Sequence, residues 1–338
     1  MFSLENYLDL PLIWFGLIAT ALFLYILLDG FDLGVGILFP FAPSDESRDR
    51  MMNSIAPFWD GNETWLVLSG GGLFAAFPLA YAILMPALYM PVILMLLGLI
   101  FRGVAFEFRF KAVKSKPIWD YAFHFGSITA TFMQGMIIGA IVTGVKVEGR
   151  GFAGHPFDYL SAYSFMTGFA MLFGYALLGA TWLVMKTDGE TQLWARKCAS
   201  YVLGYVGLFL AIVSISVPLM SPHVNALWFS LPNFFYLLPI PLLTAAVFIL
   251  MWYDLHRGRE YRPFFLSISV FFMSYLGLGI SFWPWLVPFS VTFRDAAAAP
   301  TSQSFLLIGT AVILPMVLIY VGYCYYLFRG KASQEGYY

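Results

Sequence analysis

The chain has 338 residues, of which 60% are hydrophobic and 11% are charged, and its mean hydropathy is +0.78. Soluble domains carry about 25% charged residues, so a soluble fold of this length could not cover its surface. The formal net charge of −1 provides no basic field for nucleic acid. The composition predicts an all-α polytopic membrane protein, because the apolar runs are about 20 residues long rather than short alternating strands.

Nine apolar segments follow one another along the chain and predict nine transmembrane helices. They span residues 11–39, 62–82, 86–106, 118–144, 160–185, 198–220, 229–253, 263–292 and 303–328. The connections between them are short, so we expect one membrane domain over residues 1–338. Within it we expect a first four-helix unit (1–144), a second four-helix unit in parallel orientation (160–292) and a ninth helix (303–328).

The placement of lysine and arginine predicts the orientation of these helices. The loops after the first, third, fifth and seventh segments and the C-terminus carry fourteen of these residues, whereas the opposite side carries only Lys146, Arg150 and Arg294. The excess predicts a periplasmic N-terminus and a cytoplasmic C-terminus. Residues 1–7 contain no positive charge and no small-residue cleavage site, so we expect them to be retained rather than removed as a signal peptide.

Ionisable residues inside the predicted membrane helices are concentrated in the first three. The first carries Asp29 and Asp32, the second region Asp60 and Glu63, and the third Arg102 with Glu107. At a rise of 1.5 Å per residue, all of them fall near the cytoplasmic side. Charges inside a bilayer cost several kcal/mol, so they persist where they are paired, hydrated or functional.

One arginine cannot neutralise five carboxylates, so some of these acids should be protonated or should contact water from the cytoplasm. Carboxylates of that kind can carry protons. We therefore interpret the five acids as candidates for a proton path, with Arg102 as their charge partner. A structural alternative remains open, in which the acids only cap or pack at the interface and Arg102 is a structural counter-ion.

The sequence contains no metal or haem motif. Cys198 and Cys324 form no CxxC pair, and the ordinary interpretation is that both are membrane-helix cysteines. The four histidines lie at predicted helix ends or in loops, and no two are three or four residues apart. Axial haem ligation by His124 stays as a minor alternative. We expect no catalytic centre and no metal ligand in this chain alone.

Three sequence blocks together carry a family resemblance. They are LDGFDLGVG at residues 28–36, NSIAPFWDGNETWL at 53–66, and FRGVAFEFR at 101–109. In this order and spacing they resemble subunit II of the cytochrome bd quinol oxidases, specifically over the first 125 residues or so. The short chain is similar to the compact, cyanide-insensitive type of this subunit.

The resemblance implies a haem-free subunit of a terminal oxidase in the bacterial inner (plasma) membrane, which oxidises quinol and reduces O2 to water. Haems b and d and the quinol-oxidising site would belong to the partner, subunit I, and a small single-helix subunit is a further candidate partner. The family's cytoplasmic proton path maps to Asp60, and the neighbouring block positions map to Trp59 and Asp32. Some family members bind a structural quinone in this subunit, which makes Trp59 a candidate quinone contact. Glu107 stands where the family often has aspartate.

Two other classes of function remain as alternatives. The buried carboxylates and the two four-helix units would also suit a secondary transporter coupled to cations. Against it, the later helices lack polar residues at mid-depth, and no pair of Gly/Pro-broken helices stands in corresponding halves. The third class is a purely structural partner, in which the acids only hold a complex together.

Overall fold

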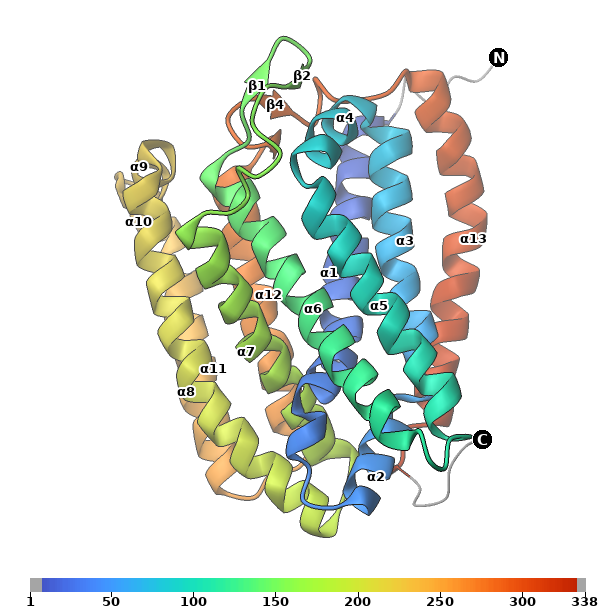
Figure 1. Ribbon diagram of the computed structural model, residues 1–338. Helices are drawn as coiled ribbons and strands as arrows, with labels where there is room; N and C mark the ends of the chain where they lie inside the picture. Colours follow the sequence, from blue (N-terminus) through green and yellow to red (C-terminus); the bar gives the residue numbers. More distant parts are fainter. Residues whose placement is uncertain (1–7, 333–338) are drawn as a thin grey trace.

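The computed structural model describes residues 8–332, so the expectation for residues 1–7 lies outside the described chain. Its long helices run roughly side by side, and short elements close the two ends of the bundle (Figure 1). The first half comprises α1 (Leu10–Leu38), the 3-10 turn η2 (Phe39–Phe41), α2 (Asp45–Ile55), α3 (Trp59–Ala76), α4 (Pro78–Ala87), α5 (Tyr89–Arg109) and α6 (Lys116–Thr143).

The second half begins with a hairpin of β1 (Val147–Glu148) and β2 (Gly151–Phe152). It continues with α7 (Ala162–Lys186), α8 (Gly189–Met220), α9 (Pro222–Phe229), α10 (Asn233–Leu237), α11 (Pro239–His256), α12 (Arg262–Phe282), a second hairpin of β3 (Trp285–Val287) and β4 (Val291–Thr292), and α13 (Pro300–Leu327). We call the end of the bundle with the two hairpins the hairpin end and the opposite end, with α2, the α2 end (Figure 1).

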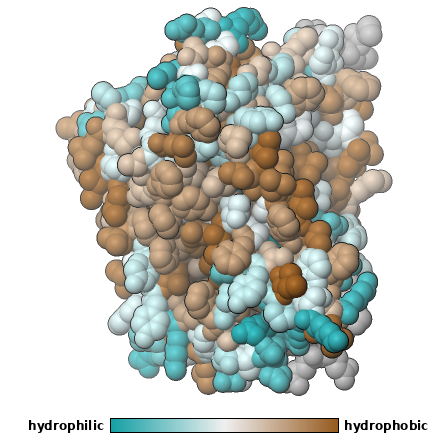
Figure 2. Space-filling model, in the orientation of Figure 1, coloured by the Kyte–Doolittle hydropathy of each residue, from teal (hydrophilic) through white to brown (hydrophobic). Residues whose placement is uncertain are grey.

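The surface of the bundle is suited to a membrane. On the face that Figure 2 shows, apolar side chains form a broad band across the middle, and polar side chains gather at both ends. Within residues 8–332, eight helices are long and apolar enough to cross a bilayer, namely α1, α5, α6, α7, α8, α11 together with α10, α12 and α13. The predicted all-α polytopic membrane protein is thus confirmed, while α3, with 18 residues, is more polar than these eight.

Four predicted segments differ from the helices in their bounds. The segment 62–82 divides into α3 and α4 at Phe77, because the residue before Pro78 is restricted to non-helical backbone. The segment 198–220 begins nine residues earlier, at Gly189, directly after the N-cap Asp188. Pro232 and Pro239 divide the region 229–253 into short helices before α11. The segment 263–292 ends as a helix at Phe282, and Pro284 precedes the β3–β4 hairpin.

The core lies where α1 meets α7. α1 also packs against α3 and α6, so it is the central helix of the bundle. A Cβ atom on Gly34 of α1 would overlap the carbonyl of Tyr175, and one on Gly179 of α7 would overlap the backbone of Gly34. These glycines therefore allow the two backbones to touch. Just beyond, Phe31 of α1 stacks on Trp182 of α7 with ring centroids 4.1 Å apart.

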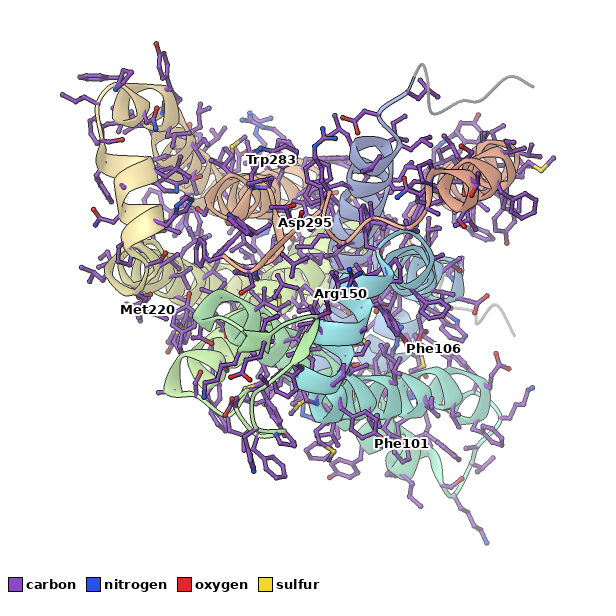
Figure 3. All side chains as sticks on the ribbon, turned by 90° about the horizontal axis from the view of Figure 1, so that it is seen from above. Phe101, Phe106, Arg150, Met220, Trp283 and Asp295 are labelled. Carbon is purple, nitrogen blue, oxygen red and sulfur yellow. The ribbon has the colours of Figure 1, made fainter. Side chains whose placement is uncertain are left out.

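The periphery is formed by helices with little protein around them. Seen along the bundle, α13 lies at one edge, and Met220 marks α8 at another (Figure 3). Arg150, Trp283 and Asp295 lie in the hairpin layer above the middle of the bundle (Figure 3). α13 has essentially no buried stretch of its own. Lipid or another protein chain must therefore cover these outer helices.

Candidate functional site

The centre of the site is the side chain of Arg102, which is completely buried on α5. Its Nη2 donates to Oδ1 of Asp29 on α1 at 2.6 Å and to Oε2 of Glu63 on α3 at 3.2 Å. Asp29 is also completely buried, whereas the Glu63 side chain is 28% exposed. One guanidinium group therefore joins three helices. Arg102 lies about two turns before the last residue of α5, on the side of the bundle that holds α2.

Asp32 lies three residues beyond Asp29 on α1, on the same side of that helix. Its Oδ2 accepts a hydrogen bond from Nδ2 of Asn62 on α3 at 2.7 Å, and Oδ1 of Asn62 accepts one from the hydroxyl of Tyr325 on α13 at 2.8 Å. Asp32 is completely buried and has no ion pair among the described residues. We refer to Asp29, Asp32, Glu63 and Arg102 as the acid–arginine cluster.

Two of the predicted acids do not join this cluster. Asp60 and Glu107 are exposed on the surface of the described chain. The helix geometry explains both, because successive residues turn by about 100°. On α3, Asn62 faces α1, and Asp60 lies two residues earlier, so the Asp60 side chain points to nearly the opposite side of the helix. On α5, Arg102 faces inward, and Glu107 lies five residues later, so its side chain is turned away by roughly 140°. Counting residues along the helices therefore places Asp29, Glu63 and Arg102 at one level of the bundle, as the structure has them. It does not predict that Asp60 and Glu107 point outward.

Trp59 is the first residue of α3, and its side chain packs against α5 beside Arg102. Its ring stacks on Phe106 with centroids 5.0 Å apart and an interplanar angle of 6°. The guanidinium carbon of Arg102 lies 5.9 Å from the centroid of the Trp59 ring, which is the range of a cation–π contact. The indole of Trp59 is thus held between the chain's own aromatic and cationic side chains at the edge of the cluster.

Arg109, the second arginine of the FRGVAFEFR block, organises a separate ionic group at the α2 end. It is buried, and it donates to Asp120 of α6 and, at 2.6 Å, to Asp49 of α2. Lys116 lies 3.0 Å from the same Asp49 carboxylate. α2 begins after the N-cap Ser44, whose hydroxyl accepts a hydrogen bond from the Ser47 amide. The contacts of Asp49 with Arg109 and Lys116 therefore attach this capped polar helix to α5 and α6.

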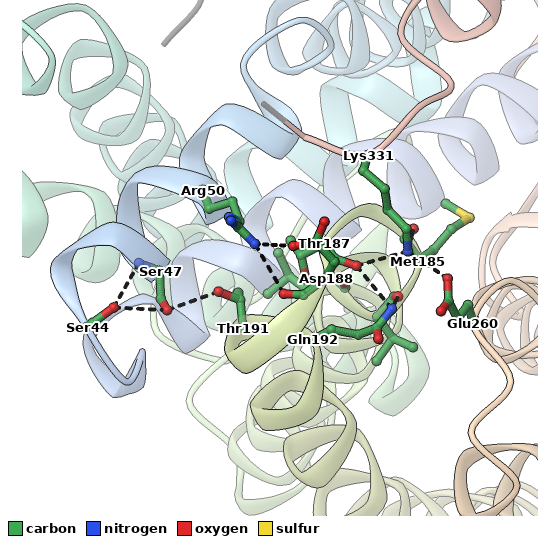
Figure 4. Close-up of polar contacts among 12 residues, drawn as sticks. Ser44, Ser47, Arg50, Met185, Thr187, Asp188, Thr191, Gln192, Glu260 and Lys331 are labelled. Carbon is green, nitrogen blue, oxygen red and sulfur yellow. Dashed lines mark hydrogen bonds and ion pairs between the residues drawn. The ribbon is translucent and has the colours of Figure 1, made fainter. Parts of the chain in front are cut away.

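Further polar contacts fasten the second half at this end (Figure 4). Arg50 of α2 bonds Asp188 at the start of α8, and Thr191 donates to Ser47 at 3.0 Å. Lys331, after α13, donates to the carbonyl of Thr187 at 2.9 Å and to Glu260 at 2.8 Å. The α2 end is therefore cross-linked by many polar contacts between segments far apart in sequence.

Several buried polar residues near the cluster carry no charge, so the pattern of charges within the membrane helices does not predict them. Asn62, in the WDGNE string, is one of these. Gln134 of α6 binds the hydroxyls of Tyr25 and Tyr175, each at 2.7 Å. A glutamine in the middle of an apolar helix is a signal that could have been used, because a buried amide needs partners.

Within residues 8–332, no group of three or more His, Cys, Asp or Glu side chains is arranged to hold a metal ion. Cys198 and Cys324 are free cysteines. Nδ1 of His124 lies 3.0 Å from the carbonyl oxygen of Gly36. An apolar cavity of about 200 Å³ lies between α1, α6, α7, α8 and α12, and Trp59 does not line it.

Fold and site together define a polytopic membrane protein that buries ionisable groups between its spans. Comparison with known proteins identifies its family. The family model for cytochrome bd terminal oxidase subunit II matches residues 10–328. The chain is 28% identical to the cytochrome bd ubiquinol oxidase subunit 2 of Bacillus subtilis (strain 168) over 333 residues, covering 96% of this chain and 97% of the relative. It is 29% identical to the cytochrome bd-I ubiquinol oxidase subunit 2 of Escherichia coli (strain K12) over 367 residues, covering 98% and 97%.

A solved structure has the same fold. It belongs to the bd oxidase of Geobacillus thermodenitrificans and matches with a TM-score of 0.73 at 17% identity, covering 95% of this chain and 99% of that one. The chain belongs to the cytochrome bd terminal oxidase subunit II family. It is a multi-pass protein of the bacterial inner membrane and a subunit of a quinol:oxygen oxidoreductase complex.

Proposed function

We propose that this chain supplies a cytoplasmic proton-uptake path to its oxidase complex and a scaffold for the haem-bearing subunit I. The observation that carries the proposal is the acid–arginine cluster: fully buried Asp29, Asp32 and Arg102 within membrane helices, with Asp60 exposed beside it. Buried ionisable groups are costly in a membrane and are typical of proton relays. Haems b and d would reside in subunit I, and quinol and O2 would be substrates of the whole complex.

The orientation follows from the same distribution of charge. We propose nine spans, with α3 as the ninth, the hairpin end in the periplasm and the α2 end in the cytoplasm. The α2 end carries Arg48, Arg50, Arg109, Lys116, Lys186, Arg196, Arg262 and Lys331, whereas the hairpin end carries Lys146, Arg150 and Arg294. This asymmetry is the positive-inside pattern. The acid–arginine cluster would then open toward the cytoplasm, where protons for oxygen reduction are taken up.

The surface formed by α3 and α5 is our candidate for the contact with subunit I. Asp60 and Glu107 are exposed on these two helices, and so are apolar side chains such as Val67 and Phe101. Lipid cannot solvate carboxylates on spanning helices, so a partner chain or water at the interface must meet them. Nothing lies within 4 Å of a Cβ placed on Gly70 or Gly71 of α3, which would let another helix approach this face closely.

Within this scheme, Asp60 would receive a proton at the interface and Glu63, one turn along α3, would connect it to the buried acids. Glu63 shares Arg102 with Asp29, and Asp32 follows on the same side of α1. The remaining relay would need hydrogen-bond contact directly or through water. Glu107 would belong to the same surface on α5.

We further propose a structural quinone beside Trp59 and a small single-helix subunit against the outer helices, as the sequence resemblance implies. The Trp59 ring offers a stacking surface and Arg102 a nearby cation. Family membership argues against the alternative of a secondary transporter coupled to cations.

The test is Asp60→Asn in the assembled oxidase. We expect quinol-dependent oxygen consumption to fall about tenfold or more, because a proton-transfer group is lost, while the haem absorption spectrum of the complex is retained. Asp295→Asn is the matched control, since Asp295 is an exposed acid at the hairpin end that bonds Thr292, and it should leave the rate unchanged. Loss of haem in Asp60→Asn would instead favour the purely structural role, and an unchanged rate would remove Asp60 from the path.

A further inference from the structure

A group of arginines joins three segments of the second half at the α2 end. α11 ends with Arg257 as its C-cap, the turn to α12 carries Arg259, and Arg262 is the first residue of α12. Arg196 of α8 lies against this turn, because its Nη1 donates to the carbonyl of Arg259 at 3.0 Å. We refer to Arg196, Arg257, Arg259 and Arg262 as the basic patch.

The backbone of the turn between α11 and α12 is held by its own hydrogen bonds. Gly258 has a φ of 75°, which glycine adopts without strain, and its N–H donates to the carbonyl of Leu255 at 3.4 Å. The N–H of Arg259 donates to the carbonyl of Asp254 at 3.1 Å, which completes a Schellman motif. The arginines of the turn therefore project from an ordered backbone, and a ligand that binds them loses little affinity to ordering of the chain.

The positive charge of the basic patch exceeds what its neighbours neutralise. The segment 254–262 contains two acids, and each already has a cation. Oδ2 of the buried Asp254 lies 3.0 Å from Nε of Arg262, and Glu260 accepts a hydrogen bond from Lys331 at 2.8 Å. Within residues 8–332, the other three arginines of the basic patch form no ion pair. The patch is therefore complementary to an anion.

The surroundings of the basic patch indicate which kind of anion. Arg257 and Arg259 are exposed, and so are the aromatic side chains of Trp252 and Tyr253 in the last turns of α11 and of Tyr261 before α12. The guanidinium carbon of Arg257 lies 5.2 Å from the centroid of the Tyr253 ring. Exposed tryptophan and tyrosine next to arginine at the end of a membrane helix are typical of the layer that holds the lipid headgroups. The anion at this level of a bilayer is a lipid phosphate.

The position of the patch in the bundle leaves it open to lipid. α8 and α11 lie at one edge of the bundle, whereas α3 and α13 lie at the opposite edge (Figure 1), so the patch is on the side away from our candidate contact with subunit I. The start of α12 adds to the attraction for an anion. The Tyr261 side chain makes no capping hydrogen bond there, and the first turn of a helix carries partial positive charge on its N–H groups.

We propose that the basic patch binds the phosphate headgroup of an anionic membrane phospholipid, with Arg257 and Arg259 as its direct contacts. The acyl chains would lie along the apolar surfaces of α11 and α12, and the headgroup would tie the end of α8 to the turn between them. In the orientation proposed above, this lipid belongs to the cytoplasmic leaflet. The proposal concerns the half of the chain that the proton path does not use, so the outcome of Asp60→Asn has no bearing on it.

The test compares the wild-type oxidase complex with the double variant Arg257→Gln/Arg259→Gln. Each purified complex is titrated in detergent with phosphatidylglycerol, and native mass spectrometry counts the lipid molecules that it retains. Removal of two headgroup cations should raise the concentration that fills this site about 30-fold, so the double variant should retain one phosphatidylglycerol fewer at low lipid. Neither side chain donates a hydrogen bond among the described residues, so we expect the variant to assemble.

The matched control is Lys146→Gln/Arg150→Gln, which removes the same charge from two exposed side chains at the hairpin end. It should retain as many phosphatidylglycerol molecules as the wild type. Sites elsewhere in the complex are common to all variants, so the difference between the two double variants isolates the basic patch. Arg257→Lys/Arg259→Lys keeps the charge and should keep the lipid, which separates loss of charge from a disturbed turn.

Equal retention of phosphatidylglycerol by the wild type and Arg257→Gln/Arg259→Gln would overturn the proposal. So would equal retention of zwitterionic phosphatidylcholine and phosphatidylglycerol at the patch, because the arginines would then serve only to orient the helices. Displacement of the lipid by inorganic phosphate at the same concentration would show a simple anion site, and an acidic protein that leaves the complex in the glutamine variant would show a protein partner instead. If the double variant fails to assemble, Arg257→Gln alone decides, with an expected weakening of about fivefold.

Discussion

The two halves of the bundle use different means to hold their helices together. Around α1, α3 and α5, completely buried Asp29 and Arg102 form an ion pair, and completely buried Asp32 accepts a hydrogen bond from Asn62. In the described chain, α8, α11 and α12 keep their charged side chains at or near their ends, as Arg196, Asp254 and Arg262 illustrate. The first half therefore accepts the cost of buried charge well inside its helices, which in membrane proteins accompanies function, whereas the second half keeps its buried charges, such as Asp254 and Lys186, near helix ends.

The same contrast appears in how closely the helices approach. α1 and α7 touch backbone to backbone at Gly34 and Gly179, which fixes α1 with respect to the rest of the bundle. By comparison, Gly204 of α8 and Gly279 of α12 have nothing within 4 Å of a Cβ position. A rigid central helix is what a row of acids needs if their separations are to be constant, and the peripheral helices have no such requirement.

The largest expected effect comes from removing the shared cation. Arg102→Met leaves Asp29 and Glu63 without their partner, and breaking a buried ion pair costs about 3–5 kcal/mol. We expect little assembled complex and a lower unfolding temperature for what remains, measured in detergent. Arg196→Met is the control in the second half: Arg196 donates to the carbonyl of Arg259 at 3.0 Å, and its loss should cost about 1 kcal/mol. Equal losses for the two variants would contradict the contrast between the halves.

The second prediction compares two glycines. In Gly179→Ala the new methyl group would collide with the backbone at Gly34, and such overpacking costs about 1–3 kcal/mol. In Gly204→Ala the methyl group enters open space, and the higher helix propensity of alanine should leave stability unchanged or raise it by up to about 1 kcal/mol. Unfolding temperatures of the two purified complexes check this. A destabilised Gly204→Ala beside an unaffected Gly179→Ala would show that the close approach of α1 and α7 is not a stabilising feature.

Much of the fold could be predicted because apolar length and charge asymmetry are properties of the sequence itself. The all-helical membrane class followed from them, and the depth of Asp29, Glu63 and Arg102 could be counted along each helix. The bends at Phe77 and before Pro239 were obscured because hydropathy is insensitive to a proline that interrupts an apolar run. The sequence therefore determined which residues share a level of the bundle, but left several helix ends uncertain.

The direction of side chains was beyond the sequence, because the rotation of a helix about its axis is set by what it packs against. Asp60 and Glu107 lie at the expected ends of α3 and α5 but face outward. The partner of Asp32 could not be anticipated from its own helix, since Asn62 reaches it from α3. Long-range amide contacts such as those of Gln134 require knowledge of which helices are neighbours, and no residue spacing encodes that.

The smallest expected effect comes from removing single acids at the α2 end: Asp49 in the first half and Glu260 in the second. Burial raises the pKa of Asp49, but hydrogen bonds from Arg109 and Lys116 outweigh it and hold the pKa below the usual range. The pKa of Glu260, in the second half, is lowered chiefly by its hydrogen bond from Lys331. Both acids are partly exposed, so solvent screening limits each contribution to at most about 1 kcal/mol.

Because the folded pKa of Asp49 is depressed, its contribution to stability is complete above the unfolded value near pH 4 and disappears as the pH falls through the lower folded value. Asp49→Asn should therefore lower the unfolding temperature at pH 7, and the difference from wild type should shrink as the pH falls through the depressed folded pKa and the native carboxylate becomes protonated too. Glu260→Gln should follow the same course with a smaller difference, since one cation rather than two contacts that acid. If the unfolding temperature of Asp49→Asn stayed equally far below that of the wild type at low pH, the Asp49 side chain would stabilise α2 by packing and not by its charge. The first half would then depend at this end on the buried apolar face of α2 alone.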